Sequence, residues 1–337
     1  MKRSLMFAGV AGLALLGACQ MLPADESAEA EVAEETIEQE EAGVLVAEAI
    51  READRTAQAE MSETAESSDE EMDTSAADAL AAALAMQPDE VKARYEWRHP
   101  GETIEFFEIE PGMTVIEALP GGGWYSKILI PYLGPEGMLV GAHYPDEMWM
   151  RILPNATDER VAGILERLET WNETAQDWYG DAGAEVYDFK LTTASLDKKE
   201  AADALLFIRA LHNLNRTEAE LKTLSQTVDE AYRLLKPGGV VGVVQHRASE
   251  DTPDDWADGN AGYLKTSFVV DVFESAGFVL EASSEINANP ADDAGPGDIV
   301  WRLAPSFATT EEGTPEREAM AAIGESDRMT LRFRKPE

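Results

Sequence analysis

Apolar residues follow two alternating patterns along this chain. Short, nearly continuous aliphatic runs, such as 202–208, are typical of strands buried on both faces of a parallel sheet. Between these runs, apolar residues recur every three or four positions, as on one face of an amphipathic helix. The runs predict strands at 113–120, 137–142, 185–191, 202–208, 240–246, 278–286 and 328–334. The helical spacing predicts helices at 101–109, 124–133, 158–178, 217–235 and 267–276.

Strands that alternate with helices in this way favour an α/β fold over a β-sandwich. We therefore expect a doubly wound, mostly parallel seven-stranded sheet with helices on both faces. The chain has 337 residues, which is enough for one to two domains.

The first residues form a separate pattern. Lys2 and Arg3 precede the apolar stretch Leu5 to Leu16, which is too short to span a bilayer stably and ends in small residues before Cys19. This order resembles a bacterial lipoprotein signal peptide, and it predicts cleavage before Cys19 and a lipid on its thiol. In such lipoproteins Gln20 at the next position implies the outer membrane, so we expect a cell-envelope protein facing the periplasm. An ordinary secretory signal with a chance cysteine is the alternative.

The segment 24–86 is rich in Ala, Glu, Asp, Ser and Thr. It holds 20 acidic residues against Arg51 and Arg55, within a chain of net charge −39. It has little to bury except alanines, which predicts a disordered tether, with a transient helix at 76–85 that caps the next domain. A specific partner-binding tail is the alternative. No basic stripe is present, so we expect no nucleic-acid partner. The expected organisation is a signal peptide at 1–19, an acidic tether at 20–86 and an α/β domain at 87–337.

A glycine-rich turn follows the first predicted strand of this domain. Gly121, Gly122 and Gly123 separate the strand from a helix-like segment that starts at Trp124, and Glu117 lies on the strand just before them. Glycines let a ligand approach the backbone closely, and a helix that starts at such a turn presents free N–H groups. This is the geometry of a nucleotide-type cofactor site at the first βα turn of an α/β sheet.

Several segments resemble class I S-adenosylmethionine-dependent methyltransferases, a superfamily with a Rossmann-like fold. They are Glu117-Ala-Leu-Pro-Gly-Gly-Gly123, Asp203 to His212, and Leu235-Lys-Pro-Gly-Gly-Val240. Together with Ser284 to Pro290 and Gly324 to Met329, they resemble predicted bacterial methyltransferases, many with export signals, over essentially all of 88–336.

The resemblance implies S-adenosylmethionine as the cofactor. The residues that it implies around the cofactor are Glu117, Pro120, Gly121, Gly122, Gly123, Trp124 and His143. Two departures from the superfamily pattern stand out. Leu119 replaces the usual first glycine, and His143-Tyr144 stands where an acidic residue usually holds the ribose, with Asp146 one turn late. Trp124 also has the simpler interpretation of core packing.

Histidines follow the predicted strands at the ligand edge of the sheet. His212, His246 and the adjoining Arg247 are our candidates for a catalytic base and for substrate orientation, since histidine titrates near neutrality. Structural, hydrogen-bonded histidines are the alternative. The histidines lack the short spacing of a metal site, so we predict no metal.

Two functions remain open from the sequence. The first is methyl transfer from S-adenosylmethionine to a small molecule, with the acceptor atom and the oligomeric state unspecified. The second is an exported lipoprotein of methyltransferase-like fold that binds another nucleotide-like or aromatic ligand without methyl transfer. Export favours the second, because S-adenosylmethionine is made in the cytoplasm, whereas the glycine turn favours the first.

Overall fold

A computed structural model describes residues 76–192 and 200–337. The predicted signal peptide, Cys19 and most of the predicted acidic tether lie outside these residues. No helix within the described residues is both long and apolar enough to cross a membrane.

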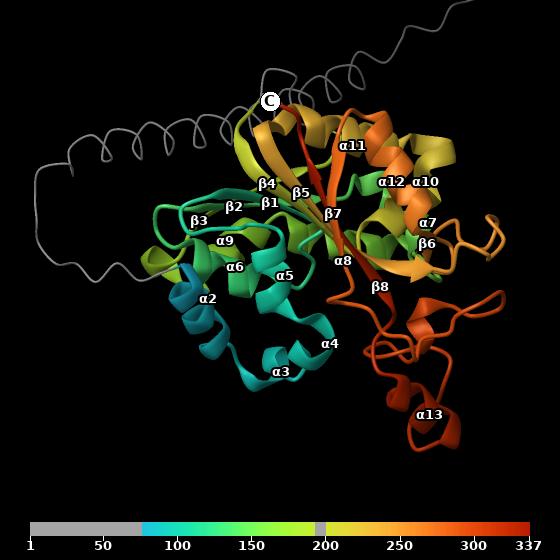
Figure 1. Ribbon diagram of the computed structural model, residues 1–337. Helices are drawn as coiled ribbons and strands as arrows, with labels where there is room; N and C mark the ends of the chain where they lie inside the picture. Colours follow the sequence, from blue (N-terminus) through green and yellow to red (C-terminus); the bar gives the residue numbers. More distant parts are fainter. Residues whose placement is uncertain (1–75, 193–199) are drawn as a thin grey trace, which may run out of the picture. The chain divides into compact units, whose positions relative to one another are not determined.

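The central sheet has the strand order β3-β2-β1-β4-β5-β8-β7 (Figure 1). The strands are β1 (Thr114–Ala118), β2 (Met138–His143), β3 (Glu185–Lys190), β4 (Ala202–Ile208), β5 (Leu235–Ala248), β7 (Val279–Ser284) and β8 (Arg328–Arg334). A short β6 (Leu264–Lys265) pairs with the end of β5. Strand β8 runs antiparallel to both β5 and β7, and the other neighbours in this order pair in parallel. The doubly wound, mostly parallel α/β sheet is confirmed.

Helices cover both faces of the sheet (Figure 1). Those before and between the first strands are α2 (Ala76–Ala85), α3 (Asp89–Lys92), α4 (Tyr95–Arg98), α5 (Pro100–Phe106), α6 (Ser126–Leu133), α7 (Asp146–Ile152), α8 (Asp158–Leu168) and α9 (Trp171–Gln176). The later helices are α10 (Leu211–Leu221), α11 (Thr223–Leu234), α12 (Thr266–Ser275) and α13 (Pro315–Ile323).

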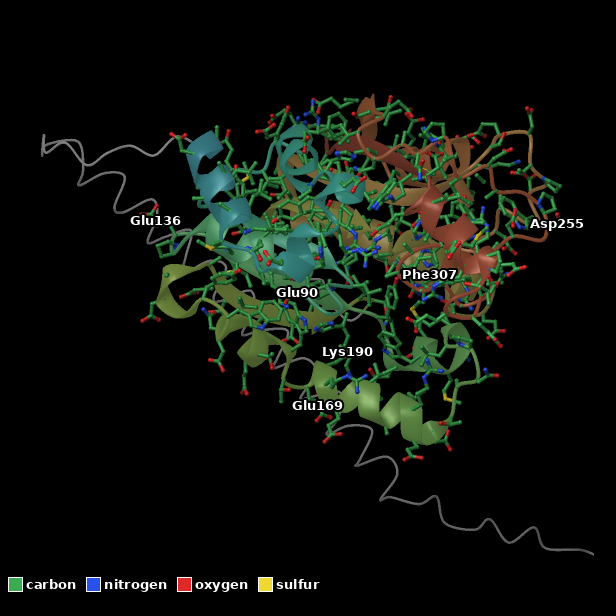
Figure 2. The ribbon with its side chains drawn as sticks, turned by 90° about the horizontal axis from the view of Figure 1, so that it is seen from below. Glu90, Glu136, Glu169, Lys190, Asp255 and Phe307 are labelled. Carbon is green, nitrogen blue, oxygen red and sulfur yellow. The ribbon has the colours of Figure 1, made fainter. Side chains whose placement is uncertain are left out.

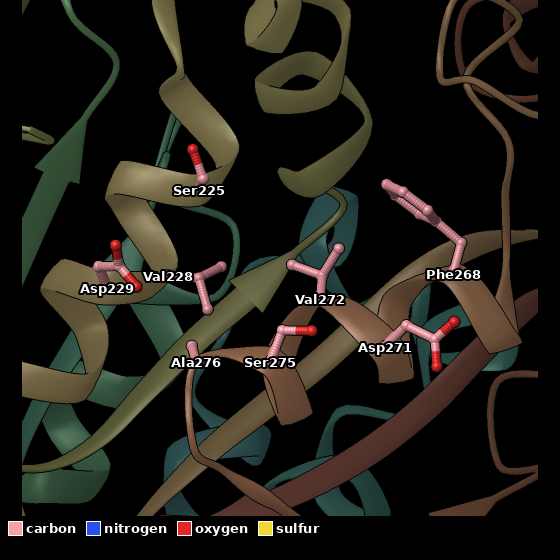
Figure 3. A pocket seen from close by; sticks show the side chains of 8 residues that line it. All are labelled: Ser225, Val228, Asp229, Phe268, Asp271, Val272, Ser275 and Ala276. Carbon is pink, nitrogen blue, oxygen red and sulfur yellow. The ribbon is translucent and has the colours of Figure 1, made fainter.

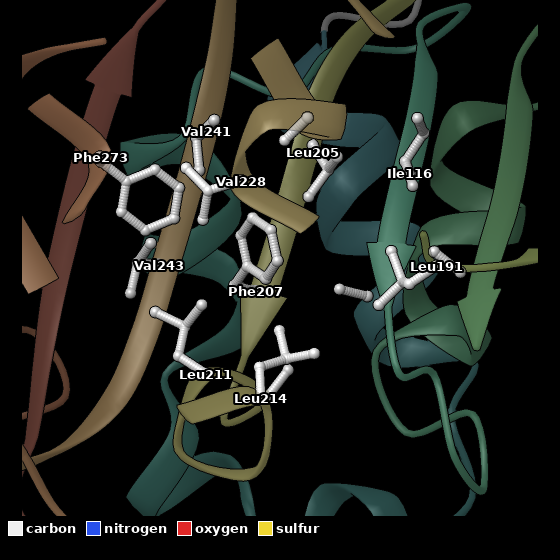
Figure 4. Packing of buried hydrophobic residues seen from close by; sticks show 14 of the residues in the cluster. Ile116, Leu191, Leu205, Phe207, Leu211, Leu214, Val228, Val241, Val243 and Phe273 are labelled. Carbon is white, nitrogen blue, oxygen red and sulfur yellow. The ribbon is translucent and has the colours of Figure 1, made fainter. Parts of the chain in front are cut away.

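Alternate residues of the buried strands face two separate cores. On β4, Leu205 and Phe207 pack toward α10, α11 and α12, whereas Leu206 packs toward α5 and α6. Figure 4 shows the first of these cores, with Val241, Val243, Leu211, Leu214, Val228 and Phe273 around the β4 side chains. A strand buried on both faces needs apolar residues at every position, which explains the continuous runs in the sequence.

Two predicted helices are each divided in the structure. The expected helix at 158–178 is interrupted between α8 and α9, and Trp171 at the start of α9 packs against Gly141 of β2 and the His143 ring. The expected helix at 217–235 is two helices that meet at Lys222, which has a left-handed φ of 59°. The first of these two helices, α10, starts at Leu211, soon after β4, so His212 lies in its first turn.

Helix α2 belongs to the packed domain. Leu80 and Ala83 on its inner face are 2% and 1% exposed and join the core formed by α5 and α6. Gln87, which follows α2, donates hydrogen bonds to the carbonyls of Ala83 and Lys127. The packed part of the chain therefore extends to Ala76, ahead of the expected boundary at residue 87.

Replacing Leu80 with Ala should lower the free energy of unfolding by about 2–4 kcal/mol, because a buried leucine leaves a cavity. Met86→Ala removes a comparable side chain that is 54% exposed, and it should change stability by less than about 0.5 kcal/mol. Urea denaturation of the full chain measures both. Equal effects of the two variants would show that α2 does not stabilise the domain.

Candidate functional site

The carboxyl ends of the parallel strands meet at one edge of the sheet, where ligands of α/β proteins bind. Strand β8 runs the opposite way, so its first residues lie at this same edge, and Arg328 pairs with His246 of β5. The glycine turn after β1, His143 at the end of β2, and Arg209 and His212 after β4 complete the edge. The structure therefore brings the residues that the sequence singled out to one edge of the sheet.

The three glycines of the turn differ in their surroundings. Gly121 and Gly122 are exposed, and an added Cβ on Gly122 would meet no atom within 4 Å. On Gly123, which has a φ of 73°, a Cβ would overlap the Trp178 ring. Gly123 is thus required by packing, whereas Gly122 leaves the backbone open to a ligand. Leu119, at the expected first glycine, has a left-handed φ of 53° despite its side chain.

Glu117 lies beneath this turn and is 3% exposed. Its carboxylate accepts a 2.6 Å hydrogen bond from the Ser126 hydroxyl in the first turn of α6. Burial raises the pKa of Glu117 to about 7, and the Ser126 hydrogen bond and the charge of Arg209 only partly oppose this shift. Near neutral pH, this carboxyl is therefore divided between its charged and neutral forms.

Pro120 and Trp124 flank the glycines. The Pro120 carbonyl accepts a 2.8 Å hydrogen bond from the Gly123 N–H, which closes the turn. The Trp124 ring lies 4.5 Å from the guanidinium carbon of Arg98 and contacts Tyr95 and Tyr125 edge to face. Its indole N–H is buried and has no hydrogen-bond partner among the described residues, which leaves a donor available beside the turn.

At the end of β2, His143 is oriented by the neighbouring strand. Its Nε2 lies 3.1 Å from an Asp188 carboxylate oxygen, while its buried Nδ1 has no partner in the described part of the chain. Nearby, Asp146 accepts from the Lys190 ammonium through one oxygen, and its buried Oδ1 likewise lacks a described partner. His143 and Asp146 thus offer two polar atoms for hydroxyl groups near β2.

His212 and His246 form a pair with ring centres 5.4 Å apart. The His246 Nδ1 lies 2.6 Å from the Ser326 hydroxyl, and the His212 Nδ1 lies 3.4 Å from the Gln245 side-chain oxygen. Burial lowers the pKa of His212 to about 4 and that of His246 well below 6.5. The charge of Arg209 lowers the pKa of both rings further, so both imidazoles are neutral at pH 7.

Arg247 lies next to His246 but is held by two carboxylates. Its guanidinium forms hydrogen bonds to both Asp327 and Glu285, and these bonds raise its pKa. It also borders a hollow of about 380 Å³ with the acidic residues Asp292 and Asp327. The observed contacts join β5 to the loops that follow β7 and precede β8, and they provide no separate evidence for the predicted catalytic role.

Four arginines that the site prediction omitted gather around Glu325. They are Arg94, Arg98, Arg209 and Arg328, which come from α3–α4, from the residue after β4, and from the start of β8. In the sequence, the segment Gly324 to Met329 carries part of the resemblance, and its polar group Glu325 to Arg328 also predicts a loop that can line the mouth of a substrate site. No spacing in the sequence connects it with Arg94 and Arg98, because the three-dimensional fold alone brings these residues together.

Other features contribute less to the site. A hollow of about 300 Å³ lies between α11 and α12, on a helical face rather than at the strand ends. Val228, Phe268 and Val272 are among the side chains that line it (Figure 3). Over residues 76–192 and 200–337, no group of three or more His, Cys, Asp and Glu residues is arranged to hold a metal ion.

Glu117→Gln should alter the dependence of stability on pH. The folded-state pKa of about 7 exceeds the ordinary value of 4.5, so the wild-type protein loses stability, on the order of 2–3 kcal/mol, as pH rises from 4.5 through 7. The glutamine retains an oxygen for Ser126 but does not ionise. The difference in unfolding free energy between variant and wild type should therefore grow in favour of the variant up to about pH 8. A constant difference between pH 5 and pH 8, measured by urea denaturation, would contradict the raised pKa.

Comparisons with known proteins yield distant similarities. No family model matches the chain. A segment of 65 residues is 37% identical to ribosomal RNA small subunit methyltransferase H of Flavobacterium psychrophilum. It covers 19% of this chain, and the chain spans only about a fifth (21%) of the length of that protein.

Solved structures of methyltransferases are also similar to this chain. The arsenic(III) S-adenosylmethionine methyltransferase of Chlamydomonas reinhardtii shares 16% identity at a TM-score of 0.42, over 77% of this chain and 73% of the other. The 1,6-didemethyltoxoflavin-N1-methyltransferase of Burkholderia thailandensis, determined with S-adenosylhomocysteine, shares 13% identity at a TM-score of 0.40, over 76% and 89%. These similarities are remote, so a function for this chain has to be argued from its own site.

Proposed function

We propose that this protein transfers a methyl group from S-adenosylmethionine to a small molecule. The observation that carries the proposal is the open glycine turn at the carboxyl edge of β1, where Gly122 leaves the backbone free for a cofactor to lie against it. The 37% identity over 65 residues with a ribosomal RNA methyltransferase supports the same reaction class.

The residues around the turn fit such a cofactor. Gly121 and Gly122 would pass beneath it, and Glu117 provides a buried carboxyl for its amino-acid end. On the β2 side, the Nδ1 of His143 and the Oδ1 of Asp146 have no hydrogen-bond partner among the described residues. The histidine nitrogen can donate to or accept from a ribose hydroxyl, and the carboxylate oxygen can accept from one. Asp146 thereby compensates for the absence of an acidic residue at the end of β2. The bound cofactor supplies a methyl group that is already activated.

The protein's own side chains would hold the methyl acceptor in place and take up the proton that it loses. His212 and His246 are neutral at pH 7, and the structure records no hydrogen bond to the Nε2 atom of either ring within its described part. In the tautomer that carries its proton on Nδ1, each ring can accept a hydrogen bond at Nε2 from the hydroxyl or amine of the methyl acceptor and hold it in place. A neutral imidazole can also take up the proton that such a group loses.

Gly122→Val should weaken the binding of S-adenosylhomocysteine by at least about tenfold, because the side chain would occupy the space above the turn. Gly122 has no left-handed φ and no near neighbour, so the domain should retain its melting temperature. Isothermal titration of the full chain measures the affinity. Gly295→Val is the matched control, since Gly295 also has open space and no left-handed φ but lies in a loop after β7.

Unchanged binding by Gly122→Val would place the ligand elsewhere. If the wild-type chain fails to bind S-adenosylhomocysteine at millimolar concentration, methyl transfer is wrong. The alternative is then a pocket for another nucleotide-like or aromatic ligand.

We further propose that a lipid on Cys19 anchors the protein in the cell envelope, at the outer membrane facing the periplasm. The basic, apolar and small-residue order before Cys19 supports this location. Cys19→Ala should move the protein from the membrane fraction to the soluble fraction of expressing bacteria, while Ser27→Ala should leave it with the membrane. Unchanged fractionation of Cys19→Ala would overturn the anchor.

A further inference from the structure

The arginines around Glu325 form a cluster of two buried and two half-buried cations around one anion. We define this arginine cluster as Arg94, Arg98, Arg209 and Arg328. The side chains of Arg98, Arg328 and Glu325 are 5%, 3% and 3% exposed, so water screens them little. Four guanidinium groups therefore surround one carboxylate at the edge of the sheet.

Glu325 is fully occupied by three of these arginines. Its oxygens accept from Arg94 and from Arg98, and an oxygen lies 3.2 Å from an Arg328 nitrogen. Burial alone would raise the pKa of Glu325, but the neighbouring arginine charges hold it below its usual value. Glu325 is thus a carboxylate at neutral pH and neutralises only one of the positive charges.

Arg209 is the arginine without a partner. Its guanidinium has no hydrogen bond or ion pair with any other described residue, and its Nε is buried. Two acidic groups interact with its charge: Glu325, which is shared with three other arginines, and Glu117, whose own pKa lies near neutrality. Arg209 as a whole is half-buried, with its Nε away from solvent. A cation that is partly shielded from water and has no partner attracts an anion.

The rest of the protein is acidic. The chain has a net charge of −39, and the labelled carboxylates in Figure 2 lie at separate places on the surface, at Glu90, Glu136, Glu169 and Asp255. A local excess of buried arginine is therefore not part of a generally basic surface. It is a specific feature of this edge of the sheet.

The cluster adjoins the histidine pair. The charge of Arg209 acts on both His212 and His246, and those of Arg98 and Arg328 act on His246 as well. A bound anion would offset these charges and raise the pKa of the histidines toward neutrality, where an imidazole is a more effective base. Substrate charge and proton acceptance would thereby be coupled.

We propose that the arginine cluster binds a carboxylate or phosphate group of the small-molecule substrate, with Arg209 as its principal contact. The proposal rests on the methyl-transfer function above and specifies its substrate as an anion. Guanidinium groups bind both oxyanions through paired N–H donors, which makes them suited to either chemistry. Arg209 follows β4, which lies between β1 with its glycine turn and β5 with His246, so the anion would bind between these two parts of the edge.

The test is the titration of the full chain with inorganic phosphate and, separately, with malonate, at constant ionic strength. We expect at least one of these probes to bind, and Arg209→Gln to weaken that binding by about tenfold or more, as expected for loss of a charge-assisted hydrogen bond. Arg209→Lys keeps the positive charge but lacks the paired N–H donors of a guanidinium, so this variant should bind the probe with intermediate affinity. Arg151→Gln, at a half-exposed arginine paired with Glu220, is the control and should bind like the wild type.

The two probes distinguish a phosphate-bearing substrate from a carboxylate-bearing one. Nuclear magnetic resonance titration of the histidines provides a second readout, with their pKa values rising when the probe binds. Equal binding by wild type and Arg209→Gln, or no binding of either probe, would overturn the proposal.

Titration with S-adenosylhomocysteine separates this proposal from the proposed function. Simultaneous binding of S-adenosylhomocysteine and the anion supports both. Competition between them would assign the cluster to the carboxylate of the cofactor and overturn a substrate role. Binding of S-adenosylhomocysteine alone leaves methyl transfer intact and refutes the anion site, whereas binding of the anion alone refutes methyl transfer.

Discussion

Two left-handed residues at the ends of adjacent strands determine the geometry of the candidate site. Leu119 after β1 and Arg209 after β4 have φ values of 53° and 59°, which are unfavourable for residues with a Cβ. Hydrogen bonds within the sheet hold both residues, from the Leu119 N–H to the Ala142 carbonyl and from the Arg209 N–H to the Val244 carbonyl. The sheet therefore stabilises a backbone path that local preference disfavours. At Leu119 the chain leaves β1 and enters the glycine turn, and at Arg209 it leaves β4 close to the histidines.

The strands were predictable from sequence because their physical requirement is local. A strand buried between two helical layers needs an apolar residue at nearly every position, and the expected bounds of β4 and β8 agree with the structure. Helix ends were less predictable. The break at Lys222 depends on a left-handed residue that is neither glycine nor proline, and Trp171 starts α9 where its ring meets a glycine in β2. The short helices α3 and α4 have no sustained periodicity of their own.

The part of the site that is formed by contiguous residues was predictable from the sequence, whereas the part assembled from distant segments was not. The glycine turn is a contiguous motif, and its position at the strand edge followed from the fold, although the separate packing role of Gly123 depends on Trp178, 55 residues later. The arginine cluster has no such contiguity. Arg98 and Glu325 are 227 positions apart and meet only because β8 enters the sheet beside β5. Charged residues scattered through an acidic chain are normally solvated, so nothing in the sequence identified these as buried.

Burial also explains why the groups at this edge act on one another. In water the charge of Arg209 would hardly affect neighbouring groups, whereas between packed layers it lowers the pKa of both histidines and opposes the upward shift of the Glu117 pKa. Glu117 lies on the side of the glycine turn and the histidines lie on the side of β5 and β8, so Arg209 connects the two halves of the edge electrostatically. Because the charge of Arg209 lowers the pKa of Glu117 and of both histidines, an anion that pairs with its guanidinium would raise the pKa of all three groups.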